Sequence, residues 1–86
     1  MEAWEIINER IESVLKEAGE NKNEYEITHE PNSKGDIWLK IKKKDTLKSY
    51  LLRILQDYYW DISNNECILI IIEDGVKALV KRVRDI

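Results

Sequence analysis

The apolar run at residues 67–72 constrains the fold of this chain more than any other feature. It lies within the segment ECILIIIEDG, residues 66–75, where six consecutive apolar residues are bounded by acidic ones. A short continuous run of this kind is typical of a strand that is buried on both faces. We therefore predict a central strand that begins near Glu66 and contains this run, with Cys67 as a small buried residue inside it.

Residues 2–18 carry the pattern of an amphipathic helix. Apolar side chains recur there at spacings of three and four, and Gly19 follows as a stop signal. Beyond a short loop, apolar and polar residues alternate in two runs that are separated by the turn-rich residues 31–35. This alternation predicts an antiparallel hairpin over residues 24–42.

Residues 47–60 predict a second helix, with Asp45 or Thr46 as its N-cap. The apolar positions that repeat there at helical spacing are Leu47, Leu51, Ile54, Leu55 and Tyr58. A strand, a helix and a fully apolar strand in this order predict a right-handed crossover, which would make the third strand parallel to the second.

The last segment of the chain has two interpretations. The pair Asp74 and Gly75 between two apolar runs is typical of a two-residue turn, which would make the C-terminal segment a hairpin strand. The apolar residues beyond it nevertheless share one face of a helix. They are Val76, Leu79, Val80 and Val83. We expect a third helix from about residue 74, with the hairpin strand as the alternative.

A length of 86 residues suits one domain with a single core. The predicted fold class is α/β, bordering on α+β, with one domain over residues 1–86. We expect the order α-β-β-α-β-α and a three-stranded mixed sheet packed with helices.

The net charge of −3 argues against a chain whose whole surface binds nucleic acid, although the charge is unevenly distributed. Residues 1–30 hold nine acidic and three basic side chains, whereas residues 31–48 hold six lysines and two aspartates. The single cysteine excludes an internal disulfide. Because the sequence has no secretory signal pattern and no apolar run of membrane-spanning length, we expect a cytoplasmic monomer that does not enter membranes.

No motif predicts a catalytic, cofactor or metal site. The glycines lack the spacing of a phosphate-binding loop. We expect His29, the only histidine, to be a packed or rim residue without a partner for a catalytic triad. The predicted sheet would gather four carboxylates at one end, which we interpret as helix caps and strand-end residues and, alternatively, as a cation or acid–base site. They are Glu24, Asp45, Glu73 and Asp74.

The basic residues around Trp38 form the candidate binding surface. The set is Trp38, Lys34, Lys40, Lys42, Lys43 and Lys44. On the predicted strand, Trp38 points away from the apolar residues beside it. We expect Trp38 to pack beneath a helix while the lysines extend past it into solvent. The alternative is a surface that binds nucleic acid, by stacking a base and neutralising phosphates, or a protein.

The segment GDIWLKIKKK, followed by the expected helix LKSYLLRILQDYY, strand ECILIII and helix VKALVKRVR, resembles the second half of PD-(D/E)XK nuclease-like domains. The resemblance implies an αβββαβ core that binds magnesium and cleaves phosphodiesters. It places Asp36 at the first acid of that family and Lys42 at its lysine. Lys40 stands where the family has its second acid, and one core strand is missing. The resemblance therefore implies a degenerate relative.

The predicted loops are short, the predicted helices have clear start or stop signals, and polar residues recur with the period of each predicted helix or strand. These features are also typical of a designed protein. We therefore expect a small, stably folded domain without catalytic activity, either a designed protein without a biological function or a small natural domain. The alternatives are a nucleic-acid or protein interaction module that uses the Trp38 surface, and a degenerate metal-dependent nuclease-like domain.

Overall fold

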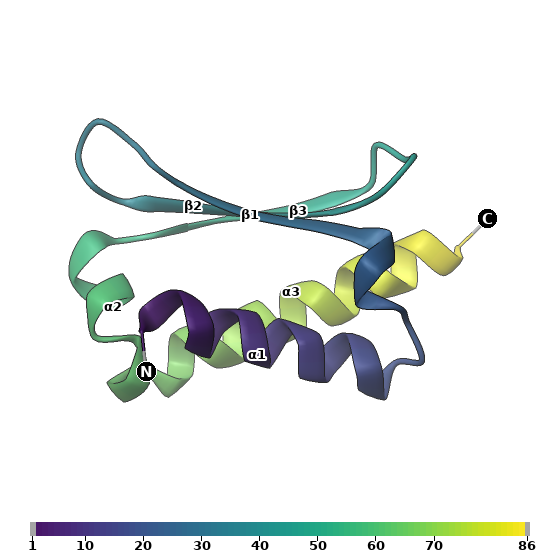
Figure 1. The fold of residues 1–86 in the computed structure, drawn as a ribbon, viewed down its shortest axis with the longest axis horizontal. Helices are drawn as coiled ribbons and strands as arrows, with labels where there is room; N and C mark the ends of the chain where they lie inside the picture. The colour runs from purple at the N-terminus through teal and green to yellow at the C-terminus, as the bar shows by residue number, and fades with distance from the viewer. Residues whose placement is uncertain (1, 86) are drawn as a thin grey trace.

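The computed structural model describes residues 2–85, which form a sheet layer and a helical layer (Figure 1). The helices are α1 (Ala3–Glu17), α2 (Gln56–Trp60) and α3 (Glu66–Arg84), and the strands are β1 (Tyr25–Pro31), β2 (Ile37–Lys43) and β3 (Ser49–Ile54). The predicted class, a single α/β domain bordering on α+β with three strands and helices packed on them, is confirmed. The order along the chain is α-β-β-β-α-α, so the predicted order is wrong in its second half.

The sheet is antiparallel throughout, with its strands in the order β1-β2-β3. The predicted hairpin over residues 24–42 is confirmed as β1 and β2. The predicted mixed sheet and its crossover are wrong, because β3 follows β2 through a turn at residues 44–48 instead of a helix. Asp45, which was expected as a helix cap, lies in this turn with a φ of 62°.

The apolar run at residues 67–72 is part of α3, so the predicted central strand is wrong. The buried residues of α3 recur at helical spacing on one stripe. They are Leu69, Ile72, Gly75, Val76, Leu79 and Val80. Ile70 and Ile71, inside the run, are 47% and 46% exposed, and Cys67 is exposed instead of buried. The expected third helix is confirmed, but it already begins at Glu66.

Residues 49–54 form β3 and not the predicted helix. The leucines at 47, 51 and 55 are spaced by four, which places them on one side of a helix and also on one face of a strand. All three are exposed. Tyr50 and Leu52 pack against the core, and Ile54 is buried in it. Only the end of the predicted helix is confirmed, as the short helix α2.

The first helix confirms the prediction for residues 2–18, and α1 packs against α3 beneath the sheet (Figure 1). Its buried stripe consists of Ala3, Ile7, Ile11, Val14 and Leu15. The chain leaves the helix at Gly19, whose φ of +75° suits a residue without a side chain. Arg10 links the two helices, because its guanidinium donates to Glu66 at 2.9 Å and to Glu73 at 3.1 Å.

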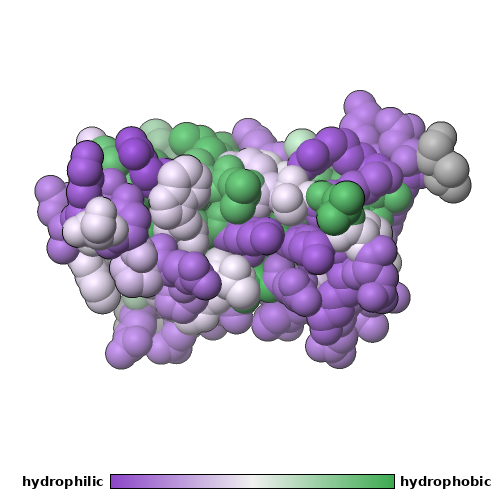
Figure 2. Space-filling model, turned by 90° about the horizontal axis from the view of Figure 1, so that it is seen from above, coloured by the Kyte–Doolittle hydropathy of each residue, from purple (hydrophilic) through white to green (hydrophobic). Residues whose placement is uncertain are grey.

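Both long helices lie on the same side of the sheet, and no element of residues 2–85 covers the other side, which we call the open face (Figure 1). Seen from above, this part of the surface is mostly hydrophilic, with hydrophobic side chains between the polar ones (Figure 2). Among residues 2–85, no helix combines the length and the apolar character needed to cross a membrane.

Candidate interaction surface on the open face

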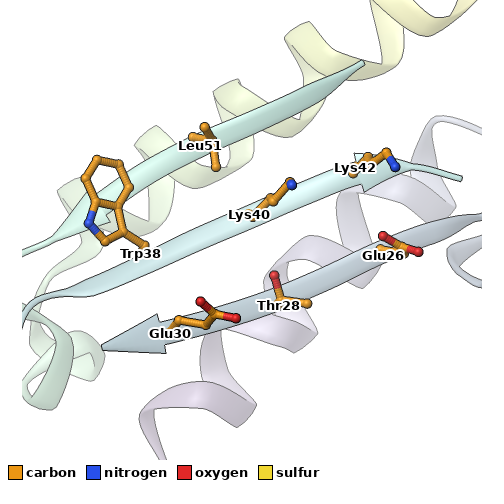
Figure 3. A pocket seen from close by; sticks show the side chains of 7 residues that line it. All are labelled: Glu26, Thr28, Glu30, Trp38, Lys40, Lys42 and Leu51. Atoms are coloured by element: carbon orange, nitrogen blue, oxygen red, sulfur yellow. The ribbon is translucent and has the colours of Figure 1, made fainter. Parts of the chain in front are cut away.

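Trp38, Lys40 and Lys42 project from β2 on the open face of the sheet (Figure 3). Alternation along β2 puts its apolar residues on the helix side, where Leu39 and Ile41 are fully buried. Trp38 is 43% exposed. The expectation that Trp38 packs beneath a helix is therefore wrong, because α1 and α3 both lie against the opposite face.

The charged side chains of the open face are arranged in rows of opposite sign. β1 contributes Glu26 and Glu30, and the neighbouring β2 contributes Lys40 and Lys42 (Figure 3). In the strand register, Glu26 lies opposite Lys42 and Glu30 lies opposite Trp38. An acidic row on the edge strand thus runs beside a basic row on the central strand.

Neither row forms ion pairs in the part of the chain that the structure describes. The ion pairs found there are Arg10 with Glu66 and Glu73, Lys22 with Glu12, Lys43 with Glu24, and Arg84 with Glu20. All of them lie away from the open face. Its carboxylates and ammonium groups therefore remain available for groups on another molecule.

An apolar patch adjoins the basic row. Leu51 of β3 lies opposite Lys40 and is 56% exposed. Together with Trp38 it borders a shallow hollow of about 500 Å³ whose remaining walls are the charged rows and Thr28. Arg53, which also belongs to β3, lies opposite Trp38 of β2. The sequence interpretation missed Leu51 and Arg53 as members of this surface because it made this segment helical; the alternation of residues 49–54 was the signal for a strand.

The other three candidate lysines do not join this surface equally. Lys43 points to the helix side, where its Nζ donates to Glu24 at 2.6 Å and lies 5.0 Å from the centre of the Tyr25 ring. Lys44 is exposed in the β2–β3 turn and borders a second hollow next to Lys42. Lys34 is exposed in the loop before β2. The predicted set is therefore only partly brought together.

Asp36, the residue that the nuclease resemblance places as an acid, acts here in local structure. Its Oδ1 accepts a hydrogen bond of 3.1 Å from the backbone N–H of Gln56, the first residue of α2. Its own backbone N–H donates to the side chain of Asn32 at 3.0 Å. Asp36 thus fastens the β1–β2 loop to the start of α2.

The four carboxylates that were expected to gather at one end of the sheet do not do so. Glu24 pairs with Lys43, and Asp45 lies in the β2–β3 turn. Glu73 and Asp74 lie in the middle of α3, where Glu73 pairs with Arg10. Within residues 2–85, no group of three or more His, Cys, Asp or Glu side chains is placed to hold a metal ion.

His29 is a rim residue on the helix side, as expected. Its ring is stacked on that of Trp4, with centroids 3.7 Å apart and planes inclined by 5°. The hydroxyl of Tyr59 lies 3.3 Å from Nδ1 of His29. The imidazole therefore contacts both an indole and a phenol, which accounts for its position at the rim.

The open face combines an exposed aromatic ring, an apolar neighbour, an arginine and unpaired charges of both signs. Aromatic and arginine residues are enriched where proteins recognise one another. The Trp38 surface is thus the strongest candidate binding site of the described chain. Comparison of this chain with family models, with curated proteins and with solved structures finds no match.

Proposed function

We propose that this chain is a non-enzymatic protein-interaction module, and that it binds an amphipathic helical segment of a partner on the open face of its sheet. The observation that carries the proposal is the exposed Trp38 on the central strand, near one end of a sheet face that no described element covers. A helix on this face would complete a third layer and bury the apolar side of the hollow.

Trp38 supplies the anchor for such a helix. Tryptophans at the centre of an interface are typical hot spots, and truncating one costs about 2 kcal/mol or more of binding free energy. The adjoining Leu51 side chain offers further apolar area to an aliphatic residue of the partner. Without a partner, both side chains remain in contact with water.

The rows of charge define the chemistry of the partner. A helix lying along the strands would have one flank over Glu26 and Glu30 and the other over Lys40 and Lys42 (Figure 3). Because Leu51 lies on β3, beyond the basic row, complementarity favours a helix with basic residues over β1, acidic residues over β2, and an apolar stripe next to the acidic ones, toward Trp38 and Leu51. The arrangement selects against helices whose flanks are both acidic or both basic.

Nucleic acid is the less favoured partner for the same reason. A backbone of phosphates would gain from Lys40, Lys42 and Arg53, but Glu26 and Glu30 line the same hollow and would repel it. The net charge of −3 adds an unfavourable long-range field.

Three synthetic helical peptides with one common apolar stripe test the proposal. Beside that stripe, the first peptide carries a row of Glu and then a row of Lys, the second carries Glu in both rows, and the third carries Lys in both rows. We expect the mixed peptide to bind at least about tenfold more tightly than either of the others. Tryptophan fluorescence reports binding, and Trp38→Phe shows whether the change comes from Trp38 and not from Trp4 or Trp60.

Charge reversal on each row separates the two classes of partner. Lys40→Glu with Lys42→Glu and, separately, Glu26→Lys with Glu30→Lys should both weaken the mixed peptide. Lys77→Glu with Lys81→Glu on α3 is the matched control, since both lysines are exposed on the helical layer. This variant should leave the affinity for the mixed peptide unchanged. Equal binding of all three peptides, or none, overturns the proposal.

Titration with oligothymidylate covers the nucleic-acid alternative. A nucleic-acid surface would give a saturable, salt-sensitive response that Glu26→Lys with Glu30→Lys strengthens. That result would indicate that the chain binds nucleic acid and not a protein helix. A domain with no role beyond its stable fold, such as a designed protein, would respond to neither peptides nor oligonucleotide.

A further inference from the structure

The outer edge of β3 carries backbone groups that no described element pairs. The N–H of Lys43 donates to the carbonyl of Lys48 at 3.1 Å, which sets the ladder so that Tyr50 and Leu52 bond to β2. The intervening residues, Leu51 and Arg53, then direct their N–H and C=O groups away from the sheet. β3 is an edge strand in a sheet of order β1-β2-β3.

The two edges of the sheet differ in how they are protected. β1 carries two acids, Glu26 and Glu30, on its exposed side and ends in Pro31, features that discourage pairing with another strand. β3 has the sequence SYLLRI, with Arg53 as its only charged residue and no proline. An apolar and unprotected edge of this kind is a template for another strand.

Exposed leucines lie on β3 and beyond both its ends. Leu47 is 95% exposed, Leu51 is 56% exposed and Leu55 is 44% exposed. Leu51 lies on the open face, and Leu55 continues the row because its backbone is extended, with φ −60° and ψ 143°. Leu47 precedes the strand, in the β2–β3 turn, so Leu51 and Leu55 make the apolar stripe beside the unpaired backbone of the free chain.

The strand is its own complement. When two copies of β3 lie antiparallel with Leu51 opposite Leu51, the exposed leucines of the two copies meet at the centre of the pairing. In the same register Ser49 faces Arg53, so the arginines do not oppose each other. We propose that β3 pairs with β3 of a second copy of this chain about a two-fold axis at Leu51, which joins two sheets into one of six strands.

The helical layer leaves room for this pairing. Arg82 of α3 reaches the edge from the helix side and donates to the carbonyl of Ser49 at 2.7 Å. That carbonyl keeps a second lone pair for the opposing strand. Because a single strand pair joins the two copies, we expect a weak dimer. It replaces the monomer expected from the sequence, and it stands independently of the partner proposed for the open face.

Sedimentation equilibrium on the full chain, from micromolar to millimolar concentration, tests the pairing. The mass of the unmodified protein should rise from monomer to dimer. Leu51→Lys and Leu51→Glu each place like charges against each other at the axis, and each should raise the dissociation constant of the dimer by at least about tenfold. An equimolar mixture of the two variants should recover a dimer with one copy of each.

Thr28→Lys is the matched control, because Thr28 is exposed on the same face but lies on β1. It should leave the dimer unchanged. Amide hydrogen exchange on the unmodified chain gives a second readout, which does not depend on the variants folding: the N–H groups of Leu51 and Arg53 should become protected as concentration rises. A monomer at millimolar concentration, or a dimer that neither Leu51 variant weakens, overturns the proposal.

Discussion

The ring of Tyr50 lies against the backbone of α3 at Gly75, so closely that a methyl group on Gly75 would overlap the ring. The contact joins β3 to the middle of the longest helix, and the hydroxyl of Tyr50 reaches the carbonyl of Ile71 at 3.5 Å. Gly75, which in the sequence suggested a hairpin turn beside Asp74, therefore serves close packing of a strand on a helix.

Gly75→Ala should destabilise the fold by about 1–3 kcal/mol, because the overlap with Tyr50 outweighs the better helix propensity of alanine. In a Tyr50→Ala background, the same change should instead stabilise by about 0.5–1 kcal/mol, since only the propensity term is left. Urea denaturation of the four proteins measures both values. An equal effect of Gly75→Ala in the two backgrounds would show that the ring is not the cause.

Stability in acid should depend on Glu20. The hydroxyl of Tyr25 donates to its carboxylate at 2.6 Å and Arg84 donates at 2.7 Å, and these bonds lower the pKa of Glu20 below 4.5. The Glu20 carboxylate therefore binds a proton at a higher pH in the unfolded chain than in the folded chain. The stabilisation is fully present above pH 4.5 and is lost as the pH falls through the folded pKa.

Glu20→Gln should therefore lower stability at neutral pH and flatten its decline between about pH 5 and 3. Glu17→Gln, at an exposed position of α1, is the control and should leave the profile unchanged. Thermal unfolding followed by circular dichroism across this range measures the effect. If the Glu20→Gln profile kept the slope of the parent protein, another group would have to be responsible.

Variants of Asp36 separate a structural role from a metal-binding one. Asp36→Ala removes the acceptor for the Gln56 N–H and should cost about 1 kcal/mol. Asp36→Asn keeps a side-chain oxygen in the same place and should retain most of that stability. A metal-dependent nuclease would instead show magnesium-dependent cleavage of DNA or RNA that both substitutions abolish.

The stack of Trp4 on His29 predicts a further local effect. His29→Ala should destabilise by about 1 kcal/mol through loss of the ring contact, whereas His29→Phe, which keeps a flat ring, should recover much of it. Denaturant titration measures the stability, and near-ultraviolet circular dichroism reports the surroundings of Trp4. Equal stability of the parent and both variants would mean that the stack contributes nothing.

Local periodicity in the sequence determined the first half of the fold. The helical spacing of residues 2–18 and the alternation of residues 24–42 each fit one type of element only, and the structure has both. The same alternation placed Trp38, Lys40 and Lys42 on one face of β2. The face that carries the candidate site was therefore predictable from the chain itself.

Tertiary structure decided the second half, because its patterns fit two periods. A spacing of four, as in Leu47, Leu51 and Leu55, is close to one helical turn and is also two strand repeats. The apolar run at residues 67–72 likewise suits a buried strand or one side of a buried helix. Pairing of β3 with β2 resolved both, since the helices then had to cover the apolar face of the sheet.

That arrangement also decided which surface is exposed. The residues next to Trp38 in the sequence do not determine whether a helix covers it. Its exposure depends on where α1 and α3 pack, and both pack against the buried side chains of the other face. Leu51 and Arg53 join the open face for the same reason, once residues 49–54 become a strand. The sequence by itself determined the sidedness of the strands, and the packing of the helices on one side determined which side was left open.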